Sequence, residues 1–226
     1  RPRILKAREV RHHNAYTLAL INEYAGWAFD EEQAFCLQGK WRSLWSEGSH
    51  FPLDLEIGTG NGTHFAHRAL TFPQRLIVGI ELKFKPLIQT IRRTRRLGCN
   101  NARVARLHAF NLDLAFAPNE IDDVFCFFPD PWVSPRKPHH RILNPRVIDI
   151  LSHLQKPKCR IYFKTDSREA FEWSLHHLRN SRYQLVYVTY DLHQTPLMQN
   201  NFITQFESIF LKKQLPICYL EAENNK

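Results

Sequence analysis

The residue best suited to binding or catalysis is Asp130, which stands between two prolines in the segment Phe-Pro-Asp-Pro-Trp at positions 128–132. Proline fixes its own φ and pushes the preceding residue out of helical space, so Asp130 is expected in a rigid, extended turn. The apolar run before it, residues 124–128, predicts a buried strand. A carboxylate held stiffly beside an indole can grip a planar polar ligand such as a base. The alternative is a polar loop in which Trp132 packs into the core.

A glycine-rich turn, Gly-Thr-Gly-Asn-Gly at positions 58–62, follows a second predicted strand at residues 53–57. Glycines at the end of a strand let the backbone approach a ligand closely. Glu56 stands two residues before the first glycine, and Glu81 ends the next predicted strand, where a carboxylate meets ribose hydroxyls. Nicotinamide cofactors and S-adenosylmethionine (SAM) are both bound in sites of this plan.

Two details favour SAM over a dinucleotide. The spacing Gly-x-Gly-x-Gly is tighter than the Gly-x-Gly-x-x-Gly that seats a pyrophosphate on a helix N-terminus. Glu56 would repel phosphates and attract the sulfonium and ammonium groups of SAM. We therefore expect a SAM site built from Glu56, Gly58, Gly60, Gly62 and Glu81. The alternative is a glycine turn with a purely structural role.

His108 follows the third predicted strand of this region. Folds of this type place a polar residue there, near the adenine of the cofactor. A lone histidine at such a position can equally be a satisfied surface residue, and both interpretations stay open.

Strand and helix patterns alternate from residue 53 onward, which predicts an α/β fold with a mainly parallel, twisted sheet and helices on both faces. The predicted strands are 53–57, 75–81, 102–107, 123–128, 158–164 and 183–190, and the predicted helices are 64–70, 86–97, 145–154 and 168–178. Residues 206–220 are expected to form a strand pair or long hairpin arm, giving the sheet an antiparallel edge strand. Residues 1–50 are expected to form a basic, helical extension with a helix over 30–46, and residues 51–226 one domain.

The charge balance favours a polyanionic partner. Lys and Arg number 31 against 22 Asp and Glu, a net charge of +9, with clusters near the N-terminus, at 92–96 and at 136–141. Nucleic acid is the leading partner class, and a generally basic surface is the alternative. The arginines at 92–96 also fit the solvated side of a helix.

Other classes of protein are disfavoured. The longest apolar run is 124–128, far short of a membrane span, and no secretory pattern opens the chain. The five cysteines are widely spaced without a Cys-x-x-Cys pair, which disfavours disulfides and metal sites and points to a reducing cytoplasm.

With these motifs taken together, the chain resembles the tRNA (guanine-N7)-methyltransferase family, a class I group of SAM-dependent enzymes. The resemblance runs from about residue 53 to 207. It rests on Leu-Glu-Ile-Gly-Thr-Gly-Asn-Gly (55–62), Gly-Ile-Glu (79–81), Phe-Pro-Asp-Pro-Trp (128–132), Thr-Asp (165–166) and Thr-Gln-Phe-Glu (204–207). It implies a Rossmann-like class I methyltransferase fold. It also implies methyl transfer from SAM to N7 of a guanine in tRNA, at position 46 of the variable loop.

The resemblance further implies roles for individual residues. Glu56, Glu81, His108 and Ala109 would border SAM, and Asp130 would be the principal catalytic residue. The substrate guanosine would meet Asp130, Ser134, Asp166, Thr204, Gln205, Phe206 and Glu207, and the RNA would meet Arg136, Lys137 and Arg141. Local alternatives stay open: Asp166 could cap the following helix, and Thr204 with Glu207 fits a capping box.

The chain departs from the family pattern at four places. His108 replaces the usual Asp or Asn, and Ser134 stands where a basic residue is typical. A basic run later in that loop is reduced to His-His-Arg at 139–141, and residues 208–213 replace an Arg-Gly and Gly-His pattern. The alternative functions are therefore a SAM-dependent methyltransferase acting on another RNA site or a small molecule, a non-catalytic RNA-binding protein on the same scaffold, and a NAD-type oxidoreductase. Oligomeric state and accessory subunits stay open.

Overall fold

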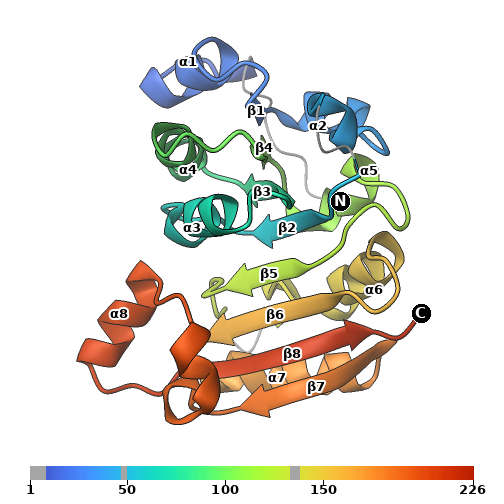
Figure 1. Cartoon of the computed structure of the whole chain (residues 1–226), viewed down its shortest axis with the longest axis vertical. Coiled ribbons are helices and arrows are strands. Elements are labelled where there is room, and N and C mark those ends of the chain that lie inside the picture. The colour runs from blue at the N-terminus through green and yellow to red at the C-terminus, as the bar shows by residue number, and fades with distance from the viewer. Residues whose placement is uncertain (1–8, 47–49, 133–137) are drawn as a thin grey trace. The chain divides into compact units, whose positions relative to one another are not determined.

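The computed structural model describes residues 9–46, 50–132 and 138–226. The chain divides into two compact units, residues 1–122 (unit 1) and 123–226 (unit 2). In Figure 1 unit 1 runs from blue through green, and unit 2 from yellow-green to red. None of the described helices is both long enough and apolar enough to cross a membrane.

In the described part of unit 1, four parallel strands lie in the order β1-β4-β3-β2. They are β1 (Ala28–Phe29), β2 (Leu53–Ile57), β3 (Leu76–Glu81) and β4 (Ala102–Arg106). Every residue of β2 and β4 is buried, as expected for parallel strands covered on both faces. In the register, Glu56 lies opposite Gly79 and Ile57 opposite Ile80, so the carboxyl ends of β2 and β3 lie at the same edge.

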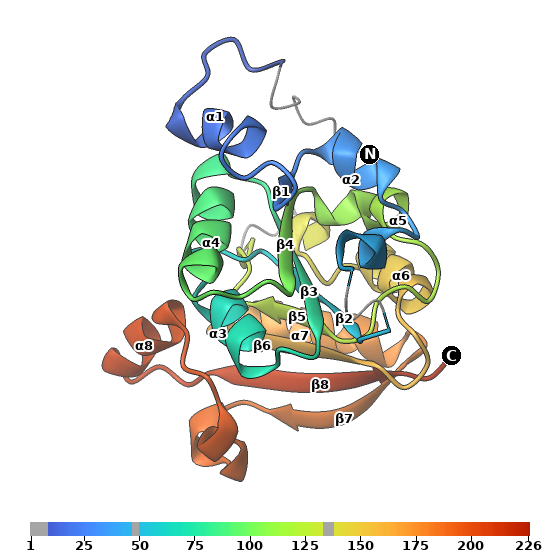
Figure 2. The ribbon, with the colours of Figure 1, turned by 45° about the horizontal axis from the view of Figure 1, so that its top comes forward.

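Helices cover both faces of the unit 1 strands, with α3 and α4 on one side and α2 and α5 on the other (Figure 2). The helices of this unit are α1 (Ala15–Ile21), α2 (Glu31–Cys36), α3 (Thr63–Thr71), α4 (Phe84–Arg96) and α5 (Leu112–Ala115). The inner side of α4 buries Leu87, Ile88 and Ile91 in a core cluster that also contains Leu20 of α1. Repeats of three and four residues along α4 put these side chains on one face, which is why the sequence pattern predicted this helix.

The described residues of unit 2 form four strands in the order β5-β6-β8-β7. They are β5 (Val124–Phe127), β6 (Arg160–Thr165), β7 (Tyr183–Thr189) and β8 (Cys218–Asn224), with helices α6 (Pro145–Leu154), α7 (Arg168–Arg179) and α8 (Gln205–Lys212). β5 and β6 are parallel, and β8 is antiparallel to both β6 and β7. The expected antiparallel pairing is therefore present in unit 2. β8 lies between β6 and β7, and β7 is the edge strand.

The segment after residue 204 is the main error of the sequence prediction. Residues 205–212 form helix α8, and a single strand, β8, follows. Thr204 is the N-cap of α8: its side chain accepts a hydrogen bond from the Glu207 N–H, and the Glu207 side chain accepts one from the Thr204 N–H. This capping box satisfies two N–H groups that a helix start leaves unpaired, and it outweighed the β-prone composition of the segment.

The single helix expected over residues 30–46 is wrong, because this segment is divided into two short elements. The helix α2 ends at Cys36, and a 3₁₀ helix, η2 (Trp41–Leu44), follows. The Glu120 carboxylate accepts hydrogen bonds from the backbone N–H groups of Gly39 and Trp41, at 2.9 and 3.2 Å. These contacts tie residues 39–44 to unit 1. The domain boundary expected near residue 50 stays a prediction.

Candidate active site

The glycine turn after β2 has one open part and one packed part. Gly58, Gly60 and Gly62 have φ values of 77°, 55° and 74°, a region that favours glycine. A Cβ added to Gly58 or Gly60 would meet no described atom within 4 Å, whereas one on Gly62 would lie 2.6 Å from Thr90 Cα. The first two glycines therefore leave room for a ligand at the backbone, and the third permits the close packing of α3 against α4.

Glu81 is held at the tip of β3 beside this turn. Its Oε2 accepts a hydrogen bond from the Gly60 N–H at 3.3 Å. Its Oε1 accepts bonds from the N–H groups of Leu82 and Lys83, at 2.8 and 3.0 Å. A carboxylate has about four acceptor sites, so one stays available for a ribose hydroxyl. The open glycines and this carboxylate fit the ribose end of SAM.

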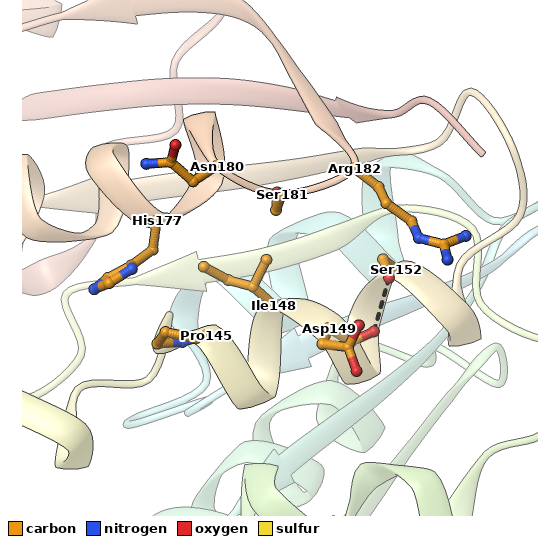
Figure 3. A pocket seen from close by; sticks show the side chains of 8 residues that line it. All are labelled: Pro145, Ile148, Asp149, Ser152, His177, Asn180, Ser181 and Arg182. Atoms are coloured by element: carbon orange, nitrogen blue, oxygen red, sulfur yellow. Dashed lines mark hydrogen bonds between the residues drawn. The ribbon is translucent and has the colours of Figure 1, made fainter.

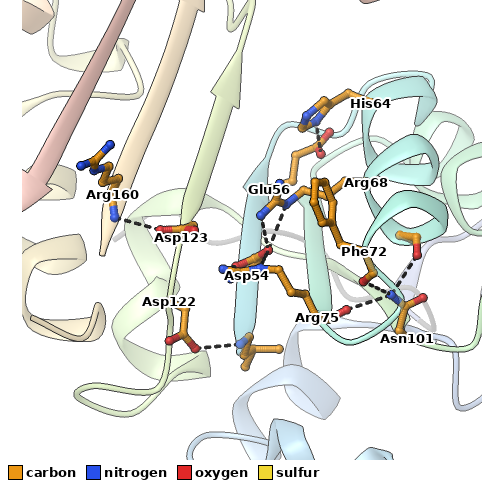
Figure 4. Close-up of polar contacts among 12 residues, drawn as sticks. Asp54, Glu56, His64, Arg68, Phe72, Arg75, Asn101, Asp122, Asp123 and Arg160 are labelled. Atoms are coloured by element: carbon orange, nitrogen blue, oxygen red, sulfur yellow. Dashed lines mark hydrogen bonds and ion pairs between the residues drawn. The ribbon is translucent and has the colours of Figure 1, made fainter. Parts of the chain in front are cut away.

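Glu56 lies at the carboxyl end of β2 and is only 4% exposed. Its Oε2 lies 2.7 Å from Nδ1 of His64, in the first turn of α3 (Figure 4). His64 is not among the site residues predicted from the sequence. The available signal was its position two residues after Gly62, where a helix that folds back over the strand brings its first turn beside Glu56.

His108 and Ala109 follow β4 at the same edge of unit 1. The His108 ring accepts a hydrogen bond from the Phe110 N–H at 3.1 Å and so caps the 3₁₀ helix η3 (Ala109–Asn111). The ring also lies 4.6 Å from the ring of Phe110, and Ala109 is buried. These contacts show a local structural role for His108, and its place near the adenine stays a prediction.

Asp130 is exposed in the loop after β5. Phe128 and Trp132, on either side of it, have φ values of 52° and 43°, a sparsely populated region for such residues. The Phe128 N–H donates to the Lys164 carbonyl of β6 at 2.8 Å. The loop is thus held in a strained backbone conformation rather than a simply extended one, and such strain is typical of functional loops. Asp130 has no hydrogen-bond or ion-pair partner among the described residues.

Arg141 fixes the far side of this loop. It is 4% exposed, and its guanidinium donates to the carbonyls of Pro131 and Trp132 at 3.0 and 3.4 Å. It also pairs with Glu169 at 2.5 Å. In this arrangement Arg141 supports the loop, and its contact with RNA stays a prediction.

Trp132, at the end of the described part of this loop, does not pack into the core. It is 39% exposed and stacks on His140 with ring centroids 4.7 Å apart. The predicted contacts Ser134, Arg136 and Lys137 lie outside the described residues.

Asp166 follows β6 and is partly exposed. The N-cap of α7 is Ser167, whose side chain accepts a hydrogen bond from the Ala170 N–H at 3.3 Å, so the capping alternative for Asp166 is wrong. Within the described part of the chain, no group makes a hydrogen bond or ion pair with the Asp166 carboxylate. Asp166 can therefore accept hydrogen bonds from a ligand, as Asp130 can.

Glu207 is fully buried. Besides its capping bond, its carboxylate lies 3.1 Å from Lys164 Nζ and 3.0 Å from His193 Nε2. Burial lowers the pKa of the Lys164 ammonium, and the Glu207 carboxylate opposes that shift. Direct contact of Glu207 and the buried Thr204 with substrate stays a prediction, whereas Gln205 and Phe206 are exposed on α8.

A groove of about 330 Å³ opens elsewhere in unit 2, between α6 and the turn after α7 (Figure 3). Its lining residues are Pro145, Ile148, Asp149, Ser152, His177, Asn180, Ser181 and Arg182. None of the predicted site residues lines it. In the described parts of the chain, no group of three His, Cys, Asp or Glu side chains is arranged to hold a metal ion.

The parallel strands, the open glycine turn and the acids that end β2 and β3 define a class I SAM-dependent methyltransferase. Solved structures share this fold. The 16S rRNA methyltransferase KamB matches with a TM-score of 0.61 at 12% identity, covering 88% of this chain and 95% of that one. The 16S rRNA (adenine(1408)-N(1))-methyltransferase from Catenulisporales acidiphilia, with SAM, matches with a TM-score of 0.58 at 13% identity, covering 82% and 91%.

Sequence comparisons give the family. Residues 50–220 match the family described as "Putative methyltransferase". The tRNA (guanine-N(7)-)-methyltransferase of Bdellovibrio bacteriovorus is 48% identical, with 91% of this chain and 99% of that protein covered. The enzyme of the same name from Bacillus licheniformis is 32% identical, with 82% and 86% covered. This chain belongs to the tRNA (guanine-N7)-methyltransferase family.

Proposed function

We propose that this protein transfers the methyl group of SAM to N7 of a guanine in tRNA, at position 46 of the variable loop. The observation that carries the proposal is the Phe-Pro-Asp-Pro-Trp loop, which holds the exposed Asp130 carboxylate rigidly and without a described partner. The likeness to the relatives named above supports the same activity. A tRNA substrate would also agree with a cytoplasmic location.

The residues of unit 1 would hold the cofactor. Gly58 and Gly60 offer open backbone, Glu81 an acceptor for the ribose, and Glu56 a negative charge for the cationic end. His108 and Ala109 would border the adenine. When bound, SAM supplies an electrophilic methyl group on a positively charged sulfur.

The residues of unit 2 would hold the guanine. Guanine N7 carries a free lone pair, so its methylation requires no general base. Asp130, with Asp166, would accept hydrogen bonds from guanine N1–H and N2–H and so orient N7 toward the methyl group. Alignment of bound reactants can remove about 7–11 kcal/mol of a barrier. A fixed carboxylate also stabilises the positive charge that the base gains.

Contacts with the rest of the tRNA would come from the loop after Trp132 and from α8. Arg136, Lys137 and Arg141 would meet RNA, and Ser134 and the Thr204–Glu207 segment would border the nucleoside. Within that segment Gln205 and Phe206 are exposed, so these two are the side chains available for direct contact.

The direct test is transfer of a tritiated methyl group from SAM to unmodified tRNA, followed by nucleoside analysis. We expect label in 7-methylguanosine, and loss of it when guanine 46 of the tRNA is replaced by adenine. Label in another nucleoside would assign the enzyme to another RNA site. SAM binding without any transfer would favour a non-catalytic RNA-binding protein, and binding of NAD in place of SAM would favour an oxidoreductase.

Replacing Arg136 by alanine should weaken tRNA binding at all sequences and flatten the salt dependence. Each phosphate that a cation neutralises contributes about 0.7–0.9 to the slope of log affinity against log salt, so the slope should fall by about one. Lys158→Ala is a matched control, because Lys158 is an exposed cation two residues before β6. An unchanged slope for Arg136→Ala would remove this residue from the RNA surface.

A further inference from the structure

Two acids of β2 pair with two bases of α3. Side chains two residues apart in a strand point to the same face, and those four apart in a helix lie on one side. Accordingly Asp54 pairs with Arg68, at 2.7 Å, and Glu56 pairs with His64, also at 2.7 Å (Figure 4). The first pair lies near the start of the strand, at its second residue. The second lies where β2 enters the glycine turn.

The His64 contact determines which oxygen of the Glu56 carboxylate is open to a ligand. Glu56 is almost completely buried, and a buried carboxylate requires hydrogen-bond donors. An ionised carboxylate only accepts, so Nδ1 of His64 is the protonated ring nitrogen in this pair. The Glu56 side chain makes no other hydrogen bond within the described ranges, so Oε2 is taken by His64 and Oε1 is left for a ligand.

We propose that His64 is a positioning residue of the cofactor site, which holds the Glu56 carboxylate so that its second oxygen faces the positively charged end of SAM. This inference rests on the proposed placement of SAM at the glycine turn. Without the imidazole, the buried Glu56 carboxylate would lose the hydrogen-bond donor that fixes its orientation, and the cofactor would lose a fixed counter-charge. The chemical step itself does not involve His64, so the loss should appear in cofactor affinity rather than in turnover at saturation.

The position of the donor atom allows a sharp choice of variants. The amide nitrogen of an asparagine side chain can take the place of imidazole Nδ1, whereas that of a glutamine takes the place of Nε2. His64→Asn should therefore retain SAM affinity within a few-fold of the wild type. His64→Leu and His64→Gln should weaken it by about 10-fold or more, the scale of one hydrogen bond to a charged group. The matched control is His67→Leu, which removes the next histidine of α3.

Three quantities are measured on the full chain: the SAM affinity by calorimetry, the melting temperature without ligand, and the KM and kcat for SAM. We expect KM to rise with little change in kcat. In a Glu56→Gln background, His64→Leu should have no further effect on affinity. Equal affinity of wild type and His64→Leu, or equal loss in the Asn and Gln variants, would overturn the inference. Should His64→Leu fail to fold, the comparison of Asn with Gln decides. Absence of SAM binding by the wild type would instead overturn the proposed function.

Discussion

Replacing Asp130 by alanine should abolish methyl transfer to tRNA while leaving SAM affinity within a few-fold of the wild type. Asp130 is exposed, lies in a loop held by Arg141 and by a bond to β6, and has no described partner of its own. Its removal therefore costs little stability. The guanine loses its main acceptor and its electrostatic stabilisation, which corresponds to a rate loss of about 100-fold or more.

Two measurements test this expectation: transfer of tritiated methyl groups to tRNA, and calorimetric titration with SAM. Asp149→Ala is the matched control, because Asp149 is an exposed carboxylate of the same unit that lines the separate groove on α6. Near-normal transfer by Asp130→Ala would remove Asp130 from catalysis. Loss of SAM binding would move it to a cofactor role.

Replacing Asp54 by alanine should lower the free energy of unfolding more than any other substitution considered for this protein. Asp54 is the second residue of β2 and is fully buried. Its carboxylate accepts two hydrogen bonds from the Arg68 guanidinium, at 2.7 and 2.9 Å, and two from Arg75, at 2.5 and 2.9 Å (Figure 4). Removing one partner of a buried charge network leaves the others uncompensated and costs about 3–5 kcal/mol. That is a large part of the roughly 5–15 kcal/mol that stabilises a typical protein.

Urea unfolding followed by circular dichroism measures this loss. The same Asp149→Ala variant serves as the surface control, since substitutions at exposed sites stay within about 0.5 kcal/mol. A loss below about 1 kcal/mol for Asp54→Ala would show that Arg68 and Arg75 are solvated well enough without the carboxylate. In that case the network would not be essential to unit 1.

The order of strands and helices was predictable because it depends on local patterns. The apolar runs of β2 to β6, and the apolar stripe of α4 with Gly98 after its end, match the predicted elements to within about two residues. The glycine turn and Glu81 were predictable for the same reason: positive φ and the end of a parallel strand are properties of short segments. The expected family is confirmed as well, because its motifs are contiguous in the chain.

The elements that the sequence analysis missed depend on contacts between distant residues. β1 has only two residues, and its pairing with β4 defines it. Residues 39–44 take their conformation from the Glu120 carboxylate, about 80 positions away in the chain. For α8 the local signal was present in the capping box. It competed with a β-prone run that suggested a strand. In the folded chain the helix forms, and its Glu207 carboxylate also lies 3.1 Å from Lys164 Nζ and 3.0 Å from His193 Nε2, two contacts between residues far apart in the sequence.

The sequence by itself determined the chemistry that this protein carries: an acid before a glycine turn, a second acid at the next strand end, and a carboxylate locked between prolines. These are properties of residue type and spacing, which a chain displays before it folds. The tertiary structure decided which of the charged groups make contacts that stabilise the fold. Arg141 is buried under the Asp130 loop, Glu207 is closed in by Lys164, and Glu56 is oriented by His64. Burial makes a charged group seek a partner, and the identity of that partner is known only once distant segments are brought together.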